Sequence, residues 1–520
     1  MRVSKIVAEI NREWEENPLR IIILLAIVSR LVAVIFSRGF GWFDDHFLII
    51  EASQSWVDGF DYNRWLPESE GNNGPTGHNL FYTGLHYILF RFFSFLGFDD
   101  PQGKMYVIRL LHAALSMVVV ILGYKITLKI GGQKAAGISG LLLALLWMFP
   151  FISVRNLVEY TCVPFLLWGT WILINDEKRR NPFFQGLLAG LILGIAFCIR
   201  FQSMVYIGGI GLGLLILGRW KEAITTGIGV LITAFLLLAT IDIYVWGYPF
   251  AELLEYIDYN MHSYAEYNIG PWYQYMLVII LALIPPISFF LIFGFFYAFI
   301  KAWRKYLLIF LPVMLFLAFH SYYPGKQERF ILPLIPFFII AGTAGWYYFL
   351  QKSRFWAGKM ALLRSSWGFF WLINIILLLV ISTTYSKRAR VESMCYLSKY
   401  QDIDNILVEN SNKGGINLLP MYYLGQWAGY GEINNTRPAS VVGTWYKENY
   451  LKMPDFVIFE GEKNIEYRLA EVKKVFPDIV YETTVSPGMI DRILFWLNPV
   501  NENQNMYIYR NTQSRPHKIE

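Results

Sequence analysis

The sequence is poor in charged residues and in cysteine, and both shortages narrow what the chain can be. Asp, Glu, Lys and Arg make up 16% of its 520 residues, whereas soluble domains usually carry about 25%. This shortage excludes an ordinary soluble protein. The three cysteines are Cys162 and Cys198, inside apolar runs, and Cys395, beyond the last one, so a disulfide framework is excluded. No basic patch stands on a soluble stretch, which excludes a nucleic-acid partner.

Long apolar runs are what the chain has instead. Hydrophobic residues make up 55% of the sequence and aromatic residues 18%. An α-helix needs about 20 apolar residues to cross a bilayer. The sequence therefore predicts a polytopic α-helical membrane protein with about eleven transmembrane helices. The expected spans are 19–37, 105–129, 135–152, 159–175, 183–200, 203–218, 222–246, 272–300, 306–322, 329–350 and 366–384.

Basic residues predict on which side of the membrane each loop lies. Lys and Arg favour the cytoplasmic side, and here they follow alternate spans. Their clusters include residues 178–180, 219–221, 301–305 and 351–354. With a cytoplasmic, uncleaved N-terminus, the first loop and the tail both lie outside. The basic stretch SKRAR at 386–390 conflicts with this arrangement.

Two domains follow from the change of character near residue 384. Residues 1–384 form the membrane domain, whose first outer loop, 38–104, holds two expected interfacial helices in HFLIIEASQSWVDG and HNLFYTGLHYILFRFFSFLG. Residues 385–520 are more polar and predict a small α/β extracytoplasmic domain. Expected strands are DFVIFEG, DIVYETTV and NMYIYRN, and expected helices are SKYQDIDNILVEN and EYRLAEVKKVF.

The stretch GWFDDHFLIIE, 41–51, follows the first span and holds four ionisable residues, Asp44, Asp45, His46 and Glu51. Charged groups near a bilayer usually face a cavity, pair with one another or mark a functional site. An aspartate at a half-buried surface can take the proton of a hydroxyl group. The aspartates can equally cap the next helix. The pattern alone leaves both interpretations open.

A second charged stretch is SYYPGKQERFILPLIPFF, 321–338. Its Pro-Gly turn carries Lys326, Glu328 and Arg329, and its prolines allow the backbone to line a cavity. Lys and Arg in such a turn suit a phosphate group. Pairing of these charges with lipid headgroups is the alternative.

Two arginines stand at outer span ends, where the positive-inside rule disfavours them. Arg155 and Glu159 lie in SVRNLVEYT, and Arg200 lies in FCIRFQS. Snorkelling to headgroups explains one such arginine, whereas a shared anionic ligand explains both. A further segment, 242–272, begins at Asp242 and is rich in tyrosine. It suits a sugar-binding surface, although an aromatic interfacial belt is the more general explanation.

These segments, in this order, resemble the dolichyl- and polyprenyl-phosphate-mannose-dependent mannosyltransferases that assemble GPI anchors and N-glycan precursors, which belong to the GT-C class. Several segments match the family's pattern: the acidic pair, the two arginine segments, DIYVWG beginning at Asp242, YIDYN and GPWYQY. The most specific match is PGKQERFILPLIP, at Pro324, Lys326, Glu328, Arg329, Phe330, Pro333 and Pro336. The chain departs from the family at Gly325, where the family has His, at Gln327, where it has an acid, and at Asp45, where it has Glu.

The resemblance implies a GT-C fold and transfer of a hexose, mannose in this family, from a polyprenyl-phosphate donor to a hydroxyl of a glycan or glycolipid. It implies an inverting displacement without metal or cofactor. The implied roles are catalytic for Asp44, as general base, and for Asp45; donor-phosphate binding for Lys326, Arg329, Arg200 and Arg155; and support for His46, Glu51, Glu328, Asp242 and Glu159.

Other functions compete with this one. Another GT-C transferase, of the protein O-mannosyltransferase or lipid A aminoarabinose type, would share the acidic pair but lack the Lys-x-Glu-Arg-Phe pattern. A transporter would show an internal repeat, which the sequence lacks, and a structural subunit would leave the outer charges unexplained. A nucleotide-sugar donor is disfavoured because no Gly-rich phosphate loop follows a strand. We expect a bacterial inner-membrane protein with a periplasmic site, or alternatively an ER membrane protein with a lumenal one.

Overall fold

The computed structural model describes residues 9, 11–69, 71–72, 74–175, 181–262, 269–412, 418–448, 450, 452–499, 503–514 and 516. The basic cluster at 178–180 lies outside them. The chain forms two compact units. Unit 1 comprises Met1–Ile35, Asn63–Leu85 and Ile108–Thr383, and unit 2 comprises Phe36–Tyr62, His86–Val107 and Thr384–Glu520. Unit 2 thus joins the tail to two segments of the first loop.

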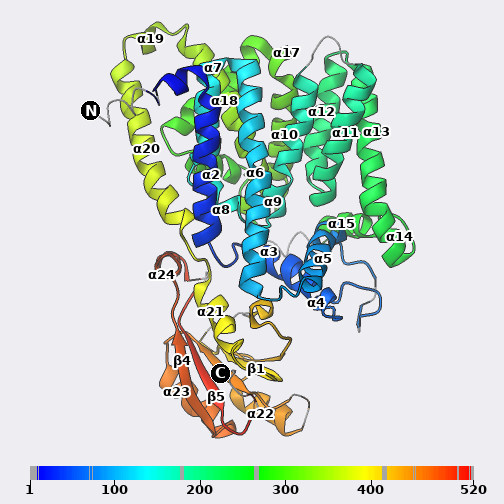
Figure 1. Ribbon diagram of the computed structural model, residues 1–520, viewed down its shortest axis with the longest axis vertical. Coiled ribbons are helices and arrows are strands. Elements are labelled where there is room, and N and C mark those ends of the chain that lie inside the picture. The colour runs from blue at the N-terminus through cyan, green and yellow to red at the C-terminus, as the bar shows by residue number, and fades with distance from the viewer. Residues whose placement is uncertain are drawn as a thin grey trace. The chain divides into compact units, whose positions relative to one another are not determined.

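Unit 1 is helical (Figure 1). The elements that lie mainly in it are α2 (Pro18–Phe36), α6 (Pro101–Gly131), α7 (Gln133–Leu145), α8 (Phe149–Ile152), α9 (Val158–Thr161), α10 (Val163–Ile174), α11 (Pro182–Ile199), α12 (Ser203–Ile216), α13 (Trp220–Ala234), η2 (Phe235–Ala239), α14 (Thr240–Trp246), α15 (Ala251–His262), α16 (Gln274–Ala282), α17 (Ile287–Tyr322), η4 (Glu328–Leu334), α18 (Ile335–Leu350), α19 (Arg354–Ala357) and α20 (Met360–Ser382).

Seven helices in the described part of the chain are long and apolar enough to cross a membrane. Three shorter apolar helices, at 133–145, 158–174 and 203–216, coincide with further expected spans. Helix α17 covers the second part of the expected span 272–300 and all of the span 306–322, with non-helical dihedrals at Ala302 between them. The multi-pass helical fold is confirmed, and the number of eleven spans stays a prediction.

Small residues set the distance between α17 and α18. A Cβ atom on Gly345 would stand 1.9 Å from the carbonyl oxygen of Gly294. One on Gly342 would stand 2.5 Å from that of Leu291. Backbones this close pack by van der Waals contact, which replaces the hydrophobic effect between helices in lipid. Helix α18 begins directly after η4, so this packing also fixes the segment that carries Arg329.

Unit 2 contains the first-loop helices and the tail. Its elements are α3 (Phe43–Asp45), η1 (His46–Glu51), α4 (Ala52–Val57), α5 (Leu80–Phe95), α21 (Arg388–Leu397), β1 (Asn405–Glu409), η5 (Met421–Leu424), β2 (Gly429–Ile433), α22 (Ala439–Lys447), β3 (Phe456–Glu460), α23 (Ile465–Val475), β4 (Ile479–Val485), α24 (Met489–Leu497) and β5 (Met506–Asn511). Both helices expected in the first loop are present, as η1 with α4 and as α5.

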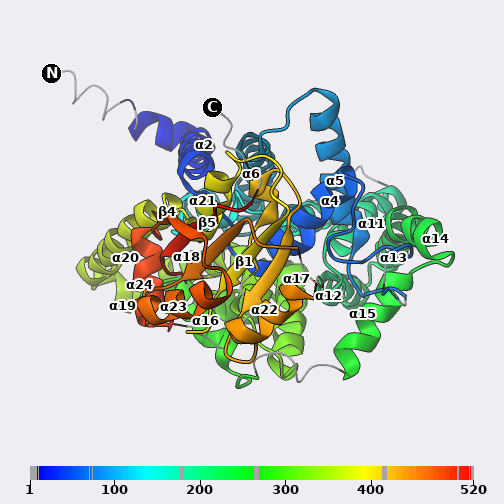
Figure 2. The ribbon, with the colours of Figure 1, turned by 90° about the horizontal axis from the view of Figure 1, so that it is seen from below.

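The tail is an α/β fold with a five-stranded sheet in the order β2-β1-β3-β5-β4. Strands β1, β2 and β3 are parallel, and β5 runs antiparallel to β3 and β4. One face of the sheet packs Leu407 and Val457 against Val442 of α22 and Val472 of α23. Figure 2 shows α22 and α23 on one side of the strands and α21 on the other.

The three expected strands and the expected helix at 466–476 are confirmed. The helix expected in SKYQDIDNILVEN is wrong, because residues 405–409 form strand β1. All five residues of this strand are buried. A central parallel strand is covered on both faces, so it reads as a continuous apolar run rather than as an alternating one. Such a short run cannot be distinguished from a helix by its periodicity.

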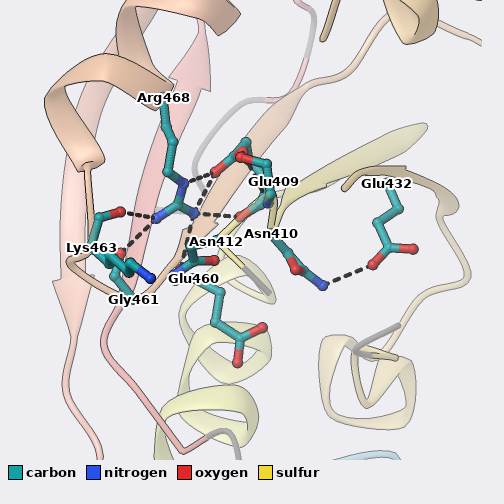
Figure 3. Close-up of polar contacts among 9 residues, drawn as sticks. Glu409, Asn410, Asn412, Glu432, Glu460, Gly461, Lys463 and Arg468 are labelled. Atoms are coloured by element: carbon teal, nitrogen blue, oxygen red, sulfur yellow. Dashed lines mark hydrogen bonds and ion pairs between the residues drawn. The ribbon is translucent and has the colours of Figure 1, made fainter. Parts of the chain in front are cut away.

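The side chain of Arg468, in α23, lies at the C-terminal ends of β1 and β3 (Figure 3). The guanidinium forms an ion pair with Glu409 and donates to the carbonyl oxygens of Glu409 at 2.8 Å, Glu460 at 2.9 Å, Gly461 at 2.9 Å and Lys463 at 3.2 Å. Strand order reverses between β1 and β3, which is where doubly wound sheets hold nucleotides. Here the arginine side chain occupies that edge.

A buried carboxylate, Glu252, fixes the loop before α5 within unit 1. Its Oε2 atom accepts the N–H groups of Thr76 at 3.1 Å and His78 at 3.0 Å, and its Oε1 atom accepts Trp246 Nε1 at 2.8 Å. Burial raises the pKa of Glu252 to about 7, and the carboxylate of Asp242 adds to the shift, while the hydrogen bonds oppose it. The loop and the start of α15 therefore depend on one perturbed acid.

We expect Arg468→Ala to lower the stability of unit 2 by roughly 3–5 kcal/mol, because it leaves Glu409 buried without its cation. Thermal unfolding of the full-length protein in detergent measures this. The stability of Arg468→Lys is expected to lie between those of the wild type and Arg468→Ala, because an ammonium group keeps the charge but lacks the planar donor fork of a guanidinium. Lys474→Ala, on an exposed site of the same helix, is the matched control and should change little. If Arg468→Ala unfolded at the wild-type temperature, the Arg468–Glu409 ion pair would not stabilise unit 2 as proposed.

The raised pKa of Glu252 predicts a pH-dependent stability. Its folded pKa of about 7 exceeds the ordinary value of 4.5, so the folded state binds the proton more tightly. The stabilisation is full below about pH 4.5 and is lost as the pH rises through about 7. We expect Glu252→Gln to flatten this slope, worth about 1–3 kcal/mol, in melting curves recorded from pH 5 to 8. Equal slopes in both proteins would refute the raised pKa.

Candidate functional site

The acidic pair lies at the start of a short helix, and its two members differ in position. Asp45 is buried, and its Oδ2 atom accepts the N–H of Trp42 at 3.4 Å, which satisfies a donor at the helix start. Asp44 is half-buried and therefore accessible from solvent. The helix-capping interpretation thus fits Asp45, while the position of Asp44 suits a group that meets a substrate.

A π-helix follows the pair and brings two of the expected supporting residues together. Residues i and i+5 of an α-helix are about 140° apart around the axis, since it has 3.6 residues per turn. A π-helix is wider, with i to i+5 backbone bonds. Within η1, His46 Nε2 lies 3.0 Å from Glu51 Oε1. The rare helix type is therefore what allows this side-chain contact.

Glu51 also connects the first loop to the tail within unit 2. Its two carboxylate oxygens accept the N–H of Tyr422 at 3.0 Å and 2.9 Å, across 371 positions in sequence. The ring of His46 stacks between Phe40, with centroids 4.8 Å apart, and Tyr423, at 5.3 Å. Both His46 and Glu51 are buried. They position the segment that carries Asp44 rather than face solvent themselves.

Glu159 is the centre of a cationic cluster in unit 1. Its Oε1 atom lies 2.5 Å from Arg200 Nη1 and 3.6 Å from Arg329 Nε. Arg200 is the residue that ends α11, with an extended backbone, and Arg329 lies in η4. All three side chains are buried. One carboxylate therefore holds two guanidinium groups side by side, an arrangement that suits an anion with several oxygens.

Gln327 and Phe330 complete the surroundings of these arginines. The Nε atom of Arg329 donates to Gln327 Oε1 at 2.7 Å. The Cζ atoms of Arg200 and Arg329 lie 5.3 Å and 5.8 Å from the ring centroid of Phe330. Gln327 is thus a neutral partner at the position where the resembling family carries an acid. It orients Arg329 without adding a negative charge.

Arg155 lies on the ring of Phe151, with its Cζ atom 4.5 Å from the centroid. It also lines a small cavity, as do His112, Ser116, Ser153, Tyr160 and Thr161. The cavity volume is about 10 Å³, which is the scale of one water molecule. A cavity of this size is too small for a substrate group.

Lys326 fastens the Pro-Gly turn to the end of α17. Its Nζ atom donates to the carbonyl oxygens of His320 at 2.6 Å and Ser321 at 2.8 Å, and also to that of Tyr323. An ammonium has three donors, so all of them are engaged. Burial lowers the pKa of Lys326. Glu328, by contrast, is exposed. The geometry gives Lys326 a structural role at a helix C-terminus, where a cation is favoured.

Residues 269–270, in the tyrosine-rich segment 242–272, lie against this turn. The N–H of Gly270 donates to the carbonyl oxygen of Pro324 at 3.3 Å, and Ile269 forms an isolated antiparallel β-bridge with Gly325. A Cβ atom on Gly270 would lie 2.7 Å from Lys326 Cγ, so glycine permits the approach. Asp242, an expected orienting residue, accepts the N–H of Glu252 at 3.2 Å and so holds the start of α15.

The structure thus gathers Glu159, Arg200 and Arg329 in unit 1, and Asp44, Asp45, His46 and Glu51 in unit 2. Sequence reasoning missed Glu252, because an acid in the first turn of a helix is the usual response to the helix dipole. It also gave Gln327 no role. The acceptor partner of Arg329 could have been sought two residues before it, on the same tight turn.

Comparison with known proteins gives this arrangement a context. Residues 20–418 match the Alg9-like mannosyltransferase family. The chain is similar to GPI mannosyltransferase 3 of Kluyveromyces lactis, with 26% identity over 280 residues that cover 50% of this chain and 42% of the relative. The matched region therefore spans less than half the length of that relative.

Two solved structures are similar in fold. ArnT from Cupriavidus metallidurans bound to undecaprenyl phosphate aligns with a TM-score of 0.59 and 12% identity, over 95% of this chain and 98% of that one. The oligosaccharyltransferase of Archaeoglobus fulgidus, in complex with Zn and sulfate, aligns with a TM-score of 0.50 and 11% identity, over 91% and 72%. Both likenesses concern the fold alone, and the expected GT-C fold is confirmed. With its family match spanning most of the membrane helices and the start of the tail, the chain belongs to the Alg9-like mannosyltransferase family.

Proposed function

We propose that this chain transfers mannose from a polyprenyl-phosphate donor to a hydroxyl group of a glycan or glycolipid. The observation that carries the proposal is the convergence of Arg200 and Arg329 on Glu159, where α11 meets η4 and α9. Two buried guanidinium groups held together beside apolar helices suit the phosphate of a lipid. Family membership supports mannose over the sugars of other GT-C transferases.

The reaction would be a single displacement at the anomeric carbon of the donor. The acceptor oxygen forms the new bond to this carbon as the bond to the phosphate oxygen breaks, so its configuration inverts. The electron pair leaves with the polyprenyl phosphate. Arg200 and Arg329 would stabilise the charge that grows on this leaving group, which is electrostatic catalysis in a water-poor site. In this mechanism arginines do what a metal ion does in other transferases.

The acceptor proton needs a base, and we assign that role to Asp44. It is the member of the acidic pair whose side chain is half-buried, whereas Asp45 holds the helix start. His46 and Glu51, through the N–H of Tyr422, would keep this segment in place. We propose that the side of the membrane with Asp44 is extracytoplasmic, the periplasm or the ER lumen, as the distribution of basic loops predicts.

We expect Asp44→Asn to reduce kcat by about 10²–10⁴, the usual contribution of a general base. The KM for the donor should change little, because the base acts on the acceptor. The assay follows transfer from polyprenyl-phosphate mannose to a glycolipid by the purified protein. Asp45→Asn serves as the comparison and is expected to lower the melting temperature as well as the rate. Full activity of a stable Asp44→Asn protein would refute Asp44 as the general base.

We expect Arg200→Gln and Arg329→Gln each to weaken binding of undecaprenyl phosphate by about 10- to 100-fold, since each removes a charge-assisted hydrogen bond worth roughly 1.5–3 kcal/mol. Binding to the purified protein can be measured by thermophoresis. Arg304→Gln, at an exposed position of α17, is the matched control and should leave the affinity unchanged. If both cluster variants bound like the control, the phosphate would have to lie elsewhere.

A further inference from the structure

Helix α24 of unit 2 buries its acid and exposes its apolar residues. The side chains of Met489, Trp496 and Leu497 are 70%, 79% and 65% exposed, whereas Asp491 is only 2% exposed. A helix on a water-facing domain does the reverse, with its apolar stripe on the core and its charges outside. Its sequence, MIDRILFWL, contains seven apolar residues among nine. The helix is therefore built for an apolar medium.

The exposed apolar residues form one continuous face. Met489, Ile493, Trp496 and Leu497 stand at positions i, i+4, i+7 and i+8, which fall on the same side of an α-helix. A tryptophan near the end of such a face is typical of helices at the boundary between headgroups and acyl chains. Scattered exposed apolar residues need no explanation, but a contiguous stripe does.

Asp491 ties this helix to the chain that has just left a membrane span. Its carboxylate accepts the N–H groups of Lys387 at 3.1 Å and Arg388 at 3.0 Å. Lys387 is the fifth residue after Ser382, where the apolar helix α20 ends. Five extended residues span at most about 18 Å. The stretch of chain between the span and the residues that bind Asp491 is therefore short.

Basic residues stand next to this anchor in the sequence. Arg388 and Arg492 are exposed, and Lys387 and Arg390 are half-buried. Cations beside an amphipathic helix attract anionic lipid headgroups, at about 1 kcal/mol per residue. The stretch SKRAR conflicts with the positive-inside rule when it is counted as a topology signal. It fits when its residues serve as headgroup ligands beside α24.

We propose that α24 is an interfacial helix that docks unit 2 on the bilayer surface. Met489, Ile493, Trp496 and Leu497 enter the acyl boundary, and Arg388 and Arg492 contact headgroup phosphates. The occupant of the apolar face is lipid, rather than a second copy of this chain or another protein. The proposal concerns membrane contact alone, so it holds or fails independently of the transfer reaction.

The test places an environment-sensitive probe on the exposed face. In the full-length protein with Cys395→Ser, Leu497→Cys is labelled with a nitrobenzoxadiazole fluorophore and reconstituted into phosphatidylethanolamine–phosphatidylglycerol vesicles. Met489→Cys is a second labelling site, and Lys474→Cys on α23 is the matched solvent control. Emission at 497 and 489 is expected to shift to the blue and to be quenched by doxyl-labelled lipid at least threefold more than at 474.

Several results would overturn the proposal. Quenching at 497 and 489 equal to that at 474 would place α24 in water. A blue shift without quenching by doxyl lipid would assign the face to a protein surface, and dependence on the protein-to-lipid ratio would identify that surface as a second copy. Replacing Arg388 and Arg492 by Gln should reduce quenching in anionic vesicles more than in purely zwitterionic ones. An equal effect in both would remove the headgroup contacts.

Discussion

The constraint on which this structure depends is that a buried ionisable group needs a partner. Glu159 meets two arginines, Glu51 meets a histidine and a backbone N–H, Lys326 meets three carbonyls and Arg468 meets a carboxylate and four carbonyls. Each of these contacts joins segments that lie apart in the sequence or turns that would otherwise be loose. The charged residues that match the family's motifs therefore also hold distant segments of the fold together.

This double use divides the motif residues by task. Asp45 and Lys326 form hydrogen bonds with backbone groups at helix ends. Glu51 and His46 contact each other within a π-helix. The residues that we propose for the chemistry are Asp44, which is half-buried, and the pair Arg200 and Arg329, which Glu159 and Gln327 hold. A motif match alone gives all of these residues equal weight. The contacts that the structure shows give Asp45, Lys326, His46 and Glu51 a positioning role.

The tail is part of the unit that carries the acidic pair rather than an appendage. The N–H of Tyr422 binds Glu51, and the ring of Tyr423 covers His46, so the tail supports the segment on which Asp44 lies. Its parallel strands resemble a nucleotide-binding sheet in topology, but Arg468 occupies the edge where the strand order reverses. A support role for the tail is compatible with the lipid-linked donor that we propose.

The sequence by itself determined the helical membrane class, the apolar segments and most strands of the tail, because hydrophobic runs and alternation are local properties of the chain. It also singled out Arg200, Arg329 and Glu159 as unusual charges at span ends. The tertiary structure decided that residues 405–409 are a strand, since a central parallel strand is buried on both faces and carries no period of its own. It alone decided that Glu159 aligns two arginines, that Lys326 caps α17 and that Glu252 holds a loop. These are contacts between distant segments, and a residue's spacing in sequence does not encode which backbone group will lie within 3 Å of it.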